Sequence, residues 1–178
     1  MRIVSGKNKG RRVTAPNNLP VRPTTDMAKE ALFNILNNRY FFNEIKVLDL
    51  FTGIGSISLE FGSRGTKDIT SVDSFNGCIR FLDTESKKLD TNLQLVKSDV
   101  FKFLENNHQQ YDIIFADPPY EMEQENFEKI HQLVYKNNLL KNNGLLIIEH
   151  SKKTDLKHLP NFEQTKKYGS NLFSFFNA

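Results

Sequence analysis

Cysteine, tryptophan and long apolar runs are scarce or absent in this chain of 178 residues. A single Cys allows no internal disulfide, so we expect a protein of a reducing compartment. No apolar stretch approaches the roughly 20 residues that a membrane-spanning helix needs. The start, MRIVSGKNKG, has no apolar region after its charges, which argues against a secretory signal peptide. We therefore predict a cytoplasmic protein without membrane contact.

The remaining composition is that of an ordinary folded domain. Hydrophobic residues make up 38% and charged residues 25% of the chain, and its length suits one domain with a sizeable core. Fifteen Phe and no Trp predict a Phe-rich core, in which Tyr supplies any polar aromatic stacking.

The segment Asp117-Pro118-Pro119-Tyr120 is the most informative, because it closes the apolar run Tyr111–Ala116. Such a run is typical of a buried strand, and the Pro pair forces the backbone to leave the sheet at Asp117. Ligands of open α/β sheets bind at this end of the strands. Tyr120 could stack on a planar base, while Asp117 and the Pro118 carbonyl accept its amino hydrogens. Taken alone, the segment fits a tight turn with a packed Tyr equally well.

A second predicted strand, Ile45–Leu50, leads into a glycine-rich turn and then a helix, which is typical of a Rossmann-type unit. Gly53 and Gly55 form a G-x-G-x-x-S pattern, in which Ser58 replaces the third Gly or Ala of a dinucleotide-binding loop. Asp49 would repel a pyrophosphate but would suit a ligand with an ammonium or sulfonium group.

Two further strands are predicted to end in carboxylates. Residues 68–72 lead to Asp73, which could hold both hydroxyls of a ribose or could simply cap a helix. Leu93–Lys97 leads to Ser98 and Asp99; Asp99 could cap the following helix or accept a hydrogen bond from an adenine amino group. Accidental convergence of four acidic strand ends is improbable, so together they indicate S-adenosylmethionine as cofactor and a base amino group as methyl acceptor.

The N-terminal region carries only positive charges before Asp26. Gly6 and Gly10 suggest a bend, so we predict a basic hairpin in which Arg2–Ser5 pairs with Arg11–Ala15. Such a hairpin could bind the phosphates of RNA or could be a solvated arm; the neighbouring base-shaped pocket favours RNA. The cations predicted to contact RNA are Arg2, Lys7, Lys9, Arg11, Arg12 and Arg22.

Further elements complete the predicted sheet. Pro20 and Pro23 mark an extended connector, and Thr24, Thr25 or Asp26 caps a helix whose apolar face is predicted to be Met27, Ala28, Ala31, Leu32, Ile35 and Leu36. A helix with Phe127, Ile130, Leu133 and Val134 on one face follows the acidic loop 121–126. Residues 142–144 are predicted to form a turn before the strand Leu145–His150, with His150 structural, and Phe162–Tyr168 and Leu172–Phe176 form a terminal hairpin.

Two sets of motifs resemble known families. The glycine turn after Asp49, the acidic strand end, Ser98-Asp99-Val100 and D-P-P-Y resemble class I methyltransferases that act on exocyclic amines. The segments 1–6, 9–11, 22–26 and 29–36 are similar to the bacterial RsmD-type family of 16S rRNA (guanine-N2)-methyltransferases. The chain departs from the usual F-A-G-T-G turn at Thr52 and Ile54, and it is also atypical in the segment 74–78. Neither change in the turn removes a donor or a carboxylate.

The resemblance implies a Rossmann-like α/β fold, with a mostly parallel seven-stranded sheet, an antiparallel last strand and an N-terminal hairpin. It implies a basic hairpin and connector at 1–22 and a methyltransferase domain at 23–178, acting as a monomer without metal. The catalytic residues are then Asp117, Pro118, Pro119 and Tyr120, and Tyr120 also contacts the RNA. The residues expected to bind S-adenosylmethionine are Thr24, Asp49, Phe51, Gly53, Gly55, Asp73, Ser98, Asp99 and Asp117. The partner would be small-subunit ribosomal RNA within an assembling 30S particle.

Three other functions remain compatible with parts of the sequence. A DNA adenine or protein glutamine methyltransferase could use the same motif, although the basic arm argues against a protein substrate and the chain has no separate region for DNA recognition. Asp49 and the missing third Gly argue against a nicotinamide dehydrogenase. A non-catalytic RNA-binding assembly factor is disfavoured by the intact Asp117, Pro118 and Tyr120.

Overall fold

A computed structural model of the chain describes residues 1–16, 19 and 24–178. Arg22, Pro20 and Pro23 lie outside the described residues, as does the predicted boundary between residues 22 and 23.

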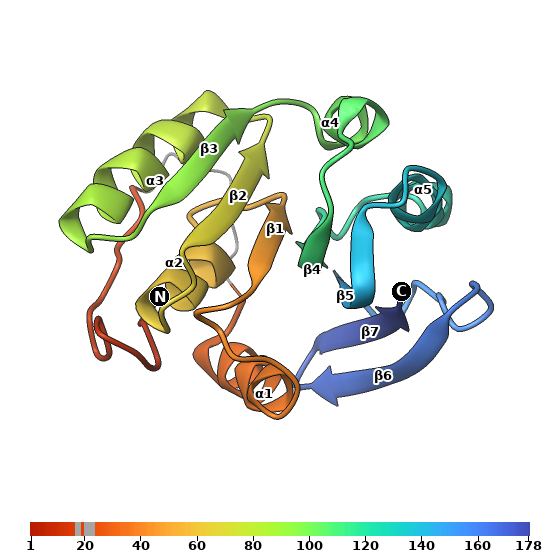
Figure 1. Cartoon of the computed structure of the whole chain (residues 1–178), viewed down its shortest axis with the longest axis horizontal. Coiled ribbons are helices and arrows are strands. Elements are labelled where there is room, and N and C mark those ends of the chain that lie inside the picture. Colours follow the sequence, from red (N-terminus) through yellow and green to blue (C-terminus); the bar gives the residue numbers. More distant parts are fainter. Residues whose placement is uncertain (17–18, 20–23) are drawn as a thin grey trace.

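The fold is built on one seven-stranded sheet in the order β3-β2-β1-β4-β5-β7-β6 (Figure 1). Only β7 runs antiparallel to its neighbours, β5 and β6, so the predicted mostly parallel sheet with an antiparallel last strand is confirmed. The strands are β1 (Lys46–Leu50), β2 (Asp68–Asp73), β3 (Leu93–Lys97), β4 (Tyr111–Ala116), β5 (Leu140–His150), β6 (Phe162–Tyr168) and β7 (Asn171–Asn177).

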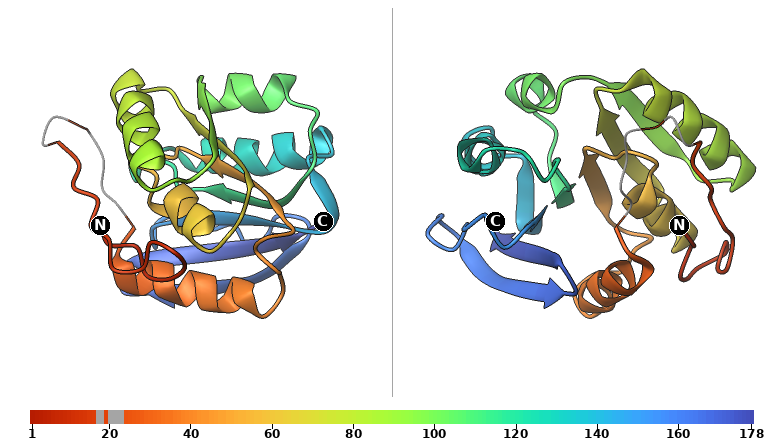
Figure 2. Two further views of the ribbon diagram at one scale, coloured as in Figure 1. Left: turned by 60° about the vertical axis from the view of Figure 1, so that its left-hand side comes forward. Right: turned by 180° about the vertical axis from the view of Figure 1, so that it is seen from behind.

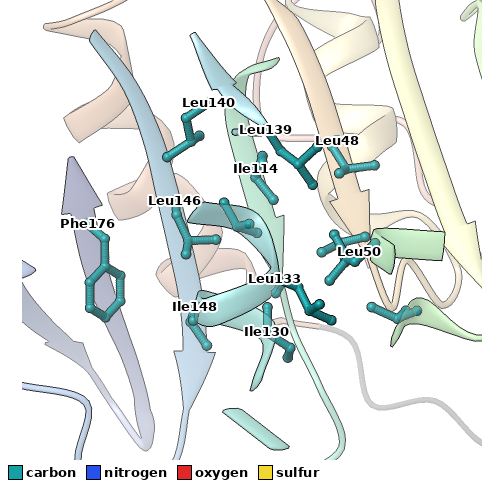
Figure 3. Packing of buried hydrophobic residues seen from close by; sticks show 14 of the residues in the cluster. Leu48, Leu50, Ile114, Ile130, Leu133, Leu139, Leu140, Leu146, Ile148 and Phe176 are labelled. Atoms are coloured by element: carbon teal, nitrogen blue, oxygen red, sulfur yellow. The ribbon is translucent and has the colours of Figure 1, made fainter. Parts of the chain in front are cut away.

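Helices cover both faces of this sheet (Figures 1 and 2). The helices are α1 (Asp26–Asn37), α2 (Ser56–Ser63), α3 (Asn76–Lys88), α4 (Val100–Asn106) and α5 (Gln124–Lys136). Apolar side chains of α1 and α2 pack on one face, and α3 extends that layer by packing with α2. Helices α4 and α5 pack on the opposite face, where Ile130 and Leu133 of α5 meet Leu48, Ile114 and Leu146 of the strands (Figure 3). Burying both faces explains why the central strands read as nearly continuous apolar runs.

The alternation of side chains along each strand decides which carboxylates can meet. Asp49 lies opposite Phe115 in the β1–β4 register, and Phe115 lies opposite Ile147 in the β4–β5 register. Phe115 and Ile147 both pack in the cluster formed with α1 and α2. Since side chains two positions apart share a face, Asp117 and Glu149 are directed to this same side as Asp49.

The N-terminal arm (residues 1–16) is docked against α2 and α3 rather than free in solvent (Figure 2). The predicted pairing is present in reduced form, as a single antiparallel bridge between Arg2 and Arg12. Ile3 and Val13 are buried with side chains of α2 and α3. Gly6 has a φ of 82°, and a Cβ there would lie 1.9 Å from the Ser63 carbonyl oxygen, so no other residue fits this close approach.

A buried charge cluster fixes the arm to α2. Glu60 accepts hydrogen bonds from the amides of Val4 (2.8 Å) and Ser5 (3.0 Å) and from Arg64 Nε (2.8 Å). Lys29 of α1 is also fully buried; its Nζ lies 3.8 Å from Glu60 and donates to the Arg2 carbonyl at 2.6 Å. Burial lowers the pKa of Lys29 from its ordinary value, and Glu60 opposes this shift. The cluster satisfies charges that would otherwise be costly to bury.

The predicted turn at 142–144 is wrong. These residues belong to β5, and the irregular register between Tyr111 and Ile113 takes up the extra length. Asn143 has a φ of 63°, a conformation that Asn tolerates, so a turn-forming sequence is used as an irregularity within a strand.

The predicted apolar face of α1 needs one correction. Met27 is 61% exposed, whereas Lys29 and Phe33, which were not predicted to face the core, are buried. The ionic cluster with Glu60 makes burial of Lys29 possible, and no pattern of apolar residues reveals this.

None of the helices among the described residues has the length and apolar character needed to span a membrane.

Candidate active site

A cleft of about 800 Å³ opens at the carboxyl ends of the parallel strands. Its wall includes residues from the loops after β1, β2 and β4, together with Thr24 from the segment before α1. The residues that line it are Thr24, Asp49, Phe51, Thr52, Gly53, Ile54, Ser56, Ile57, Asp73, Ser74, Phe75, Cys78, Phe115, Asp117, Pro118, Pro119, Tyr120 and Glu121. Thus most of the residues expected to bind cofactor, and all four predicted catalytic residues, meet in one cleft.

Asp49 is the most deeply buried carboxylate of this cleft, with 2% of its surface exposed. Its Oδ2 accepts hydrogen bonds from Thr52 Oγ1 (2.7 Å), from the Ser58 amide (3.2 Å) and from the Ser58 hydroxyl. Burial raises the pKa of the Asp49 carboxyl to about 6, and the bonds from Ser58 and Thr52 oppose this rise. A cation in the cleft would therefore stabilise the ionised form of Asp49.

Two residues that depart from the expected motifs hold Asp49 in place. Ser58 stands where a dinucleotide-binding loop would have Gly or Ala, and its hydroxyl also lies 2.7 Å from the Ser71 hydroxyl. Thr52 occupies the position of Ala in the usual turn. In the sequence both residues are departures from a motif; the signal that could have revealed their role is the need of a buried Asp for nearby donors.

Asp73, the last residue of the neighbouring strand β2, is hydrogen-bonded to the glycine turn. Its Oδ2 accepts from the Gly53 amide and its Oδ1 from the Phe75 amide, both at 2.8 Å. Each oxygen retains acceptor capacity for a ligand hydroxyl. Gly55 begins α2 with a φ of 78°, and a Cβ there would lie 2.3 Å from Leu82 Cδ1.

Phe51 adopts a left-handed conformation that is rare for an aromatic residue, with a φ of 58°. It follows β1 directly and lines the cleft. Such backbone strain is common where a chain turns sharply beside a ligand site.

Asp117 follows β4 and is half-buried at the cleft. Burial raises the pKa of its carboxyl well above the usual range, and the charges of Glu149 and Asp49 raise this pKa further. Pro118 is buried, Pro119 exposed and Tyr120 half-buried, so the segment presents both a carboxylate and an aromatic ring to the cleft.

Glu149 is a neighbour of Asp117 that the sequence analysis did not single out. It is 1% exposed and accepts hydrogen bonds from Thr24 Oγ1 at 3.1 Å and from Asn171 Nδ2. Thr25, not Thr24, caps α1 by accepting from the Ala28 amide at 3.2 Å. Thr24 is therefore free of the capping role and points to the carboxylates instead.

Of the predicted cofactor residues, Gly55, Ser98 and Asp99 do not line the cleft. Asp99 caps α4 by accepting from the Lys102 amide at 3.0 Å. The wall near the atypical segment 74–78 is formed by Ser74, Phe75 and Cys78.

The cations of the N-terminal arm are all exposed. Arg2 lies 3.6 Å from Asp26 and Lys7 lies 2.9 Å from Asp90, whereas Lys9, Arg11 and Arg12 form no ion pair with another described residue. Lys7 lies near the Ser63 end of α2, about 12 Å along this eight-residue helix from the cleft at Ser56. Arg22 lies outside the described residues.

His150 has a structural environment, as predicted. Its Nε2 lies 2.7 Å from the Ser174 hydroxyl and its Nδ1 2.9 Å from the Ser151 carbonyl oxygen. Burial lowers the pKa of His150 from its ordinary value. Among the residues that the structure describes, no group of His, Cys, Asp and Glu is arranged to hold a metal ion.

The donor and acceptor groups of the cleft suit a cationic nucleoside. Asp49 offers negative charge, Asp73 offers acceptors for hydroxyls, and Tyr120 offers an aromatic face. S-adenosylmethionine has a positive charge, ribose hydroxyls and a planar base that complement these three features, so the residues present fit the predicted cofactor.

Comparison with known proteins agrees with this geometry. Residues 1–177 match the family model described as Conserved hypothetical protein 95. The chain is 35% identical over 150 residues to the ribosomal RNA small subunit methyltransferase D of Buchnera aphidicola subsp. Baizongia pistaciae, covering 84% of this chain and 75% of the relative. Identity to the protein of that name from Haemophilus influenzae is 30% over 188 residues, with 98% and 91% covered.

Solved structures show the same fold. The yhhF protein of Escherichia coli superimposes with a TM-score of 0.86 at 25% identity, covering 99% of this chain and 97% of the other. The Thermus thermophilus 16S rRNA N2 G1207 methyltransferase, solved with AdoMet and guanosine, has a TM-score of 0.70 at 20% identity, with 89% of this chain and 45% of that one covered. The predicted Rossmann-like methyltransferase fold is thus confirmed.

The raised pKa of Asp49 predicts a specific dependence of stability on pH. The unfolded chain holds this proton with a pKa near 4, and the folded protein holds it with a pKa of about 6. Between these values the folded state binds more protons, so the contribution of Asp49 to stability is present at low pH and is lost as pH rises through 6. Relative to Asp49→Asn, the wild type should lose about 3 kcal/mol of unfolding free energy from about pH 3 to about pH 7.

Urea denaturation across this pH range measures the difference between the two proteins. Asp83→Asn, which changes an exposed carboxylate paired with Lys87, is the matched control. A constant difference between wild type and Asp49→Asn over the whole range would contradict the prediction.

Proposed function

The chain belongs to the family described as Conserved hypothetical protein 95, and from this membership we propose that it methylates the exocyclic N2 amine of a guanine in 16S ribosomal RNA, with S-adenosylmethionine as methyl donor. The observation that carries the proposal is the convergence of Asp117, Pro118 and Tyr120 with Asp49 and Asp73 in one cleft. The names of the curated relatives support the same reaction class and substrate.

Different residues of the cleft would bind different parts of the cofactor. Asp73 would hold the ribose hydroxyls, while Asp49, fixed by Thr52 and Ser58, would favour the positive end of the molecule. When bound, S-adenosylmethionine supplies an activated methyl group on its sulfonium. The protein then mainly has to bring the acceptor nitrogen into line with that methyl group.

The D-P-P-Y segment would position the acceptor. The lone pair of guanine N2 is delocalised into the ring, and hydrogen bonds from its two hydrogens to Asp117 and to the Pro118 carbonyl would favour a more nucleophilic geometry. Asp117 need not be a strong base, because the proton can leave after positive charge has developed on the nitrogen. Tyr120 would stack on the base, which must first be unstacked at a cost of a few kcal/mol.

The arm would contact the RNA backbone on the same side of the molecule as α2. Lys9, Arg11 and Arg12 are exposed and form no ion pair with other described residues, so they are available to phosphates. Since the arm is docked by buried contacts, it would present these cations in a fixed position. We place the reaction in the cytoplasm, on an assembling 30S particle, with the enzyme as a monomer.

Methyl transfer from radiolabelled S-adenosylmethionine tests the proposal. The acceptors are under-methylated 16S RNA, small subunits, DNA and protein in parallel. Label in the N2 of guanosine supports the proposed function; label in DNA or protein keeps the reaction type but replaces the substrate. Absence of label from every acceptor would favour a non-catalytic assembly factor.

Replacing Asp117 separates acceptor positioning from cofactor binding. Asp117→Ala should lower kcat by roughly 100-fold or more, because one acceptor for the amine hydrogens is lost at the reacting centre. Asp117→Asn keeps a carbonyl oxygen and should lose less activity. Calorimetric titration should show S-adenosylmethionine affinity largely unchanged in both. Weakened cofactor binding with normal turnover would refute this assignment.

Removing cations from the arm should weaken RNA binding and its dependence on salt. In the double variant Arg11→Ala and Arg12→Ala, the slope of log Kobs against log salt concentration should become shallower by roughly 1.5. The matched control replaces Lys166 and Lys167, which are exposed on the edge strand β6, with Ala. Equal slopes for the arm variant and the wild type would exclude these Arg residues from phosphate binding.

A further inference from the structure

Glu149 occupies an unusual position for a carboxylate, because it is almost fully buried beside a second acidic residue. It stands near the end of β5 and is 1% exposed. Ala116 pairs with Ile148 in the β4–β5 register, so Asp117 and Glu149 follow at neighbouring strand ends on the α1 face. The charge of Glu149 acts on Asp117, since it contributes to the raised pKa of that residue.

Glu149 joins three segments that are distant in the sequence. Its Oε2 accepts from Thr24 Oγ1 at 3.1 Å, and its Oε1 accepts from Asn171 Nδ2 at the start of β7. Thr24 and Asn171 are each 4% exposed. The carboxylate therefore ties the segment before α1 and the terminal hairpin to the strand beside the D-P-P-Y segment.

The Thr24 hydroxyl reaches both carboxylates. It donates to Glu149 Oε2 at 3.1 Å, and it lines the cleft together with Asp117, whose pKa responds to a side-chain hydrogen bond with Thr24. A hydroxyl has one hydrogen to donate and two lone pairs with which to accept. Because the hydrogen is donated to Glu149, the hydroxyl oxygen can bond to Asp117 only by accepting, so this contact needs the protonated Asp117 carboxyl. Glu149 thereby sets the orientation of the Thr24 hydroxyl, and the position of the Asp117 carboxyl depends on that orientation.

We propose that Glu149 is a positioning residue for methyl transfer: through the Thr24 hydroxyl it holds one oxygen of the Asp117 carboxyl, so that the other oxygen is oriented to accept a hydrogen of the acceptor amine. This inference rests on the proposed function, which gives Asp117 that role. It adds Glu149 to the machinery and assigns the Thr24 hydroxyl to Asp117 rather than to the cofactor, and neither residue needs to touch the base. Glu149 has the geometry for this role because each of its two oxygens is held by its own donor, Oε2 by Thr24 and Oε1 by Asn171.

Exchanging the Thr24 hydroxyl tests the proposal directly. Thr24→Val keeps the shape of the side chain but removes the donor, and Glu149→Gln keeps the shape but removes the second acceptor oxygen. Each should lower kcat on the order of 10-fold, because a small misplacement of a positioning group is costly at the reacting centre. The KM for RNA and the Kd for S-adenosylmethionine should remain close to those of the wild type. Thr24→Ser restores the hydroxyl and should recover most of the rate.

Thr25→Val is the matched control on the adjacent residue. It removes the hydroxyl that caps α1, so it should lower Tm while leaving kcat unchanged. A purely structural role for Thr24 would give the same pattern in Thr24→Val, with wild-type kcat, and would overturn the proposal. So would a loss confined to KM or to cofactor affinity. If Glu149→Gln fails to fold, Thr24→Val and Thr24→Ser still decide the question.

The kinetic constants are measured on whichever acceptor the wild type methylates. Failure of the proposed substrate therefore shows in the wild type, as label in another acceptor. Failure of the positioning role shows only in the variants, as an unchanged kcat in Thr24→Val.

Discussion

The need to satisfy one buried carboxylate, Asp49, organises the glycine turn between β1 and α2 at the cleft. An ionised carboxylate this deep in a protein must be hydrogen-bonded, and its donors come from the turn and first residues of α2. Thr52 and Ser58 thus fix how α2 leaves β1. Asp73 then closes the turn by accepting from the Gly53 amide. Thr52 and Ser58, which depart from the common form of the motif, thus hold the turn through their hydroxyl contacts to Asp49.

The alternation of side chains along the strands decides which polar groups lie together beside Asp117. In neighbouring parallel strands, Asp117 and Glu149 fall on the face covered by α1 because their registers are fixed by the apolar residues before them. Helix α1 brings Thr24 to this point, and Thr25 alone serves as its cap. Segments distant in the chain therefore meet beside Asp117: Glu149 accepts hydrogen bonds from Thr24, before α1, and from Asn171, at the start of β7.

The N-terminal arm is bonded to α2, the helix that begins directly after the glycine turn. Glu60, in the middle of α2, accepts from Val4 and Ser5, and it shares its charge with Lys29 and Arg64. Helix α2 therefore relates the exposed cations of the arm to the cleft by a fixed length of about 12 Å. A rigid connection of this kind would set the distance between a bound backbone and an extruded base.

The order of the elements and a site at the carboxyl ends of the strands could be predicted from the sequence, because apolar strands and their terminal Asp residues are local patterns. Leu93–Lys97 and Tyr111–Ala116 have the predicted bounds, and the cleft unites Asp49, Asp73 and Asp117 as expected.

The contacts of Ser58, Lys29 and Glu149 could not be predicted in this way. Each of these residues is polar and buried, and its burial depends on partners far along the chain: Asp49 and Ser71 for Ser58, Glu60 for Lys29, and Thr24 and Asn171 for Glu149. The choice between Thr24 and Thr25 as cap was likewise open in the sequence, since both have the required hydroxyl. Long-range pairing of polar groups has no local periodicity, which is why it becomes visible only once the sheet and helices are assembled.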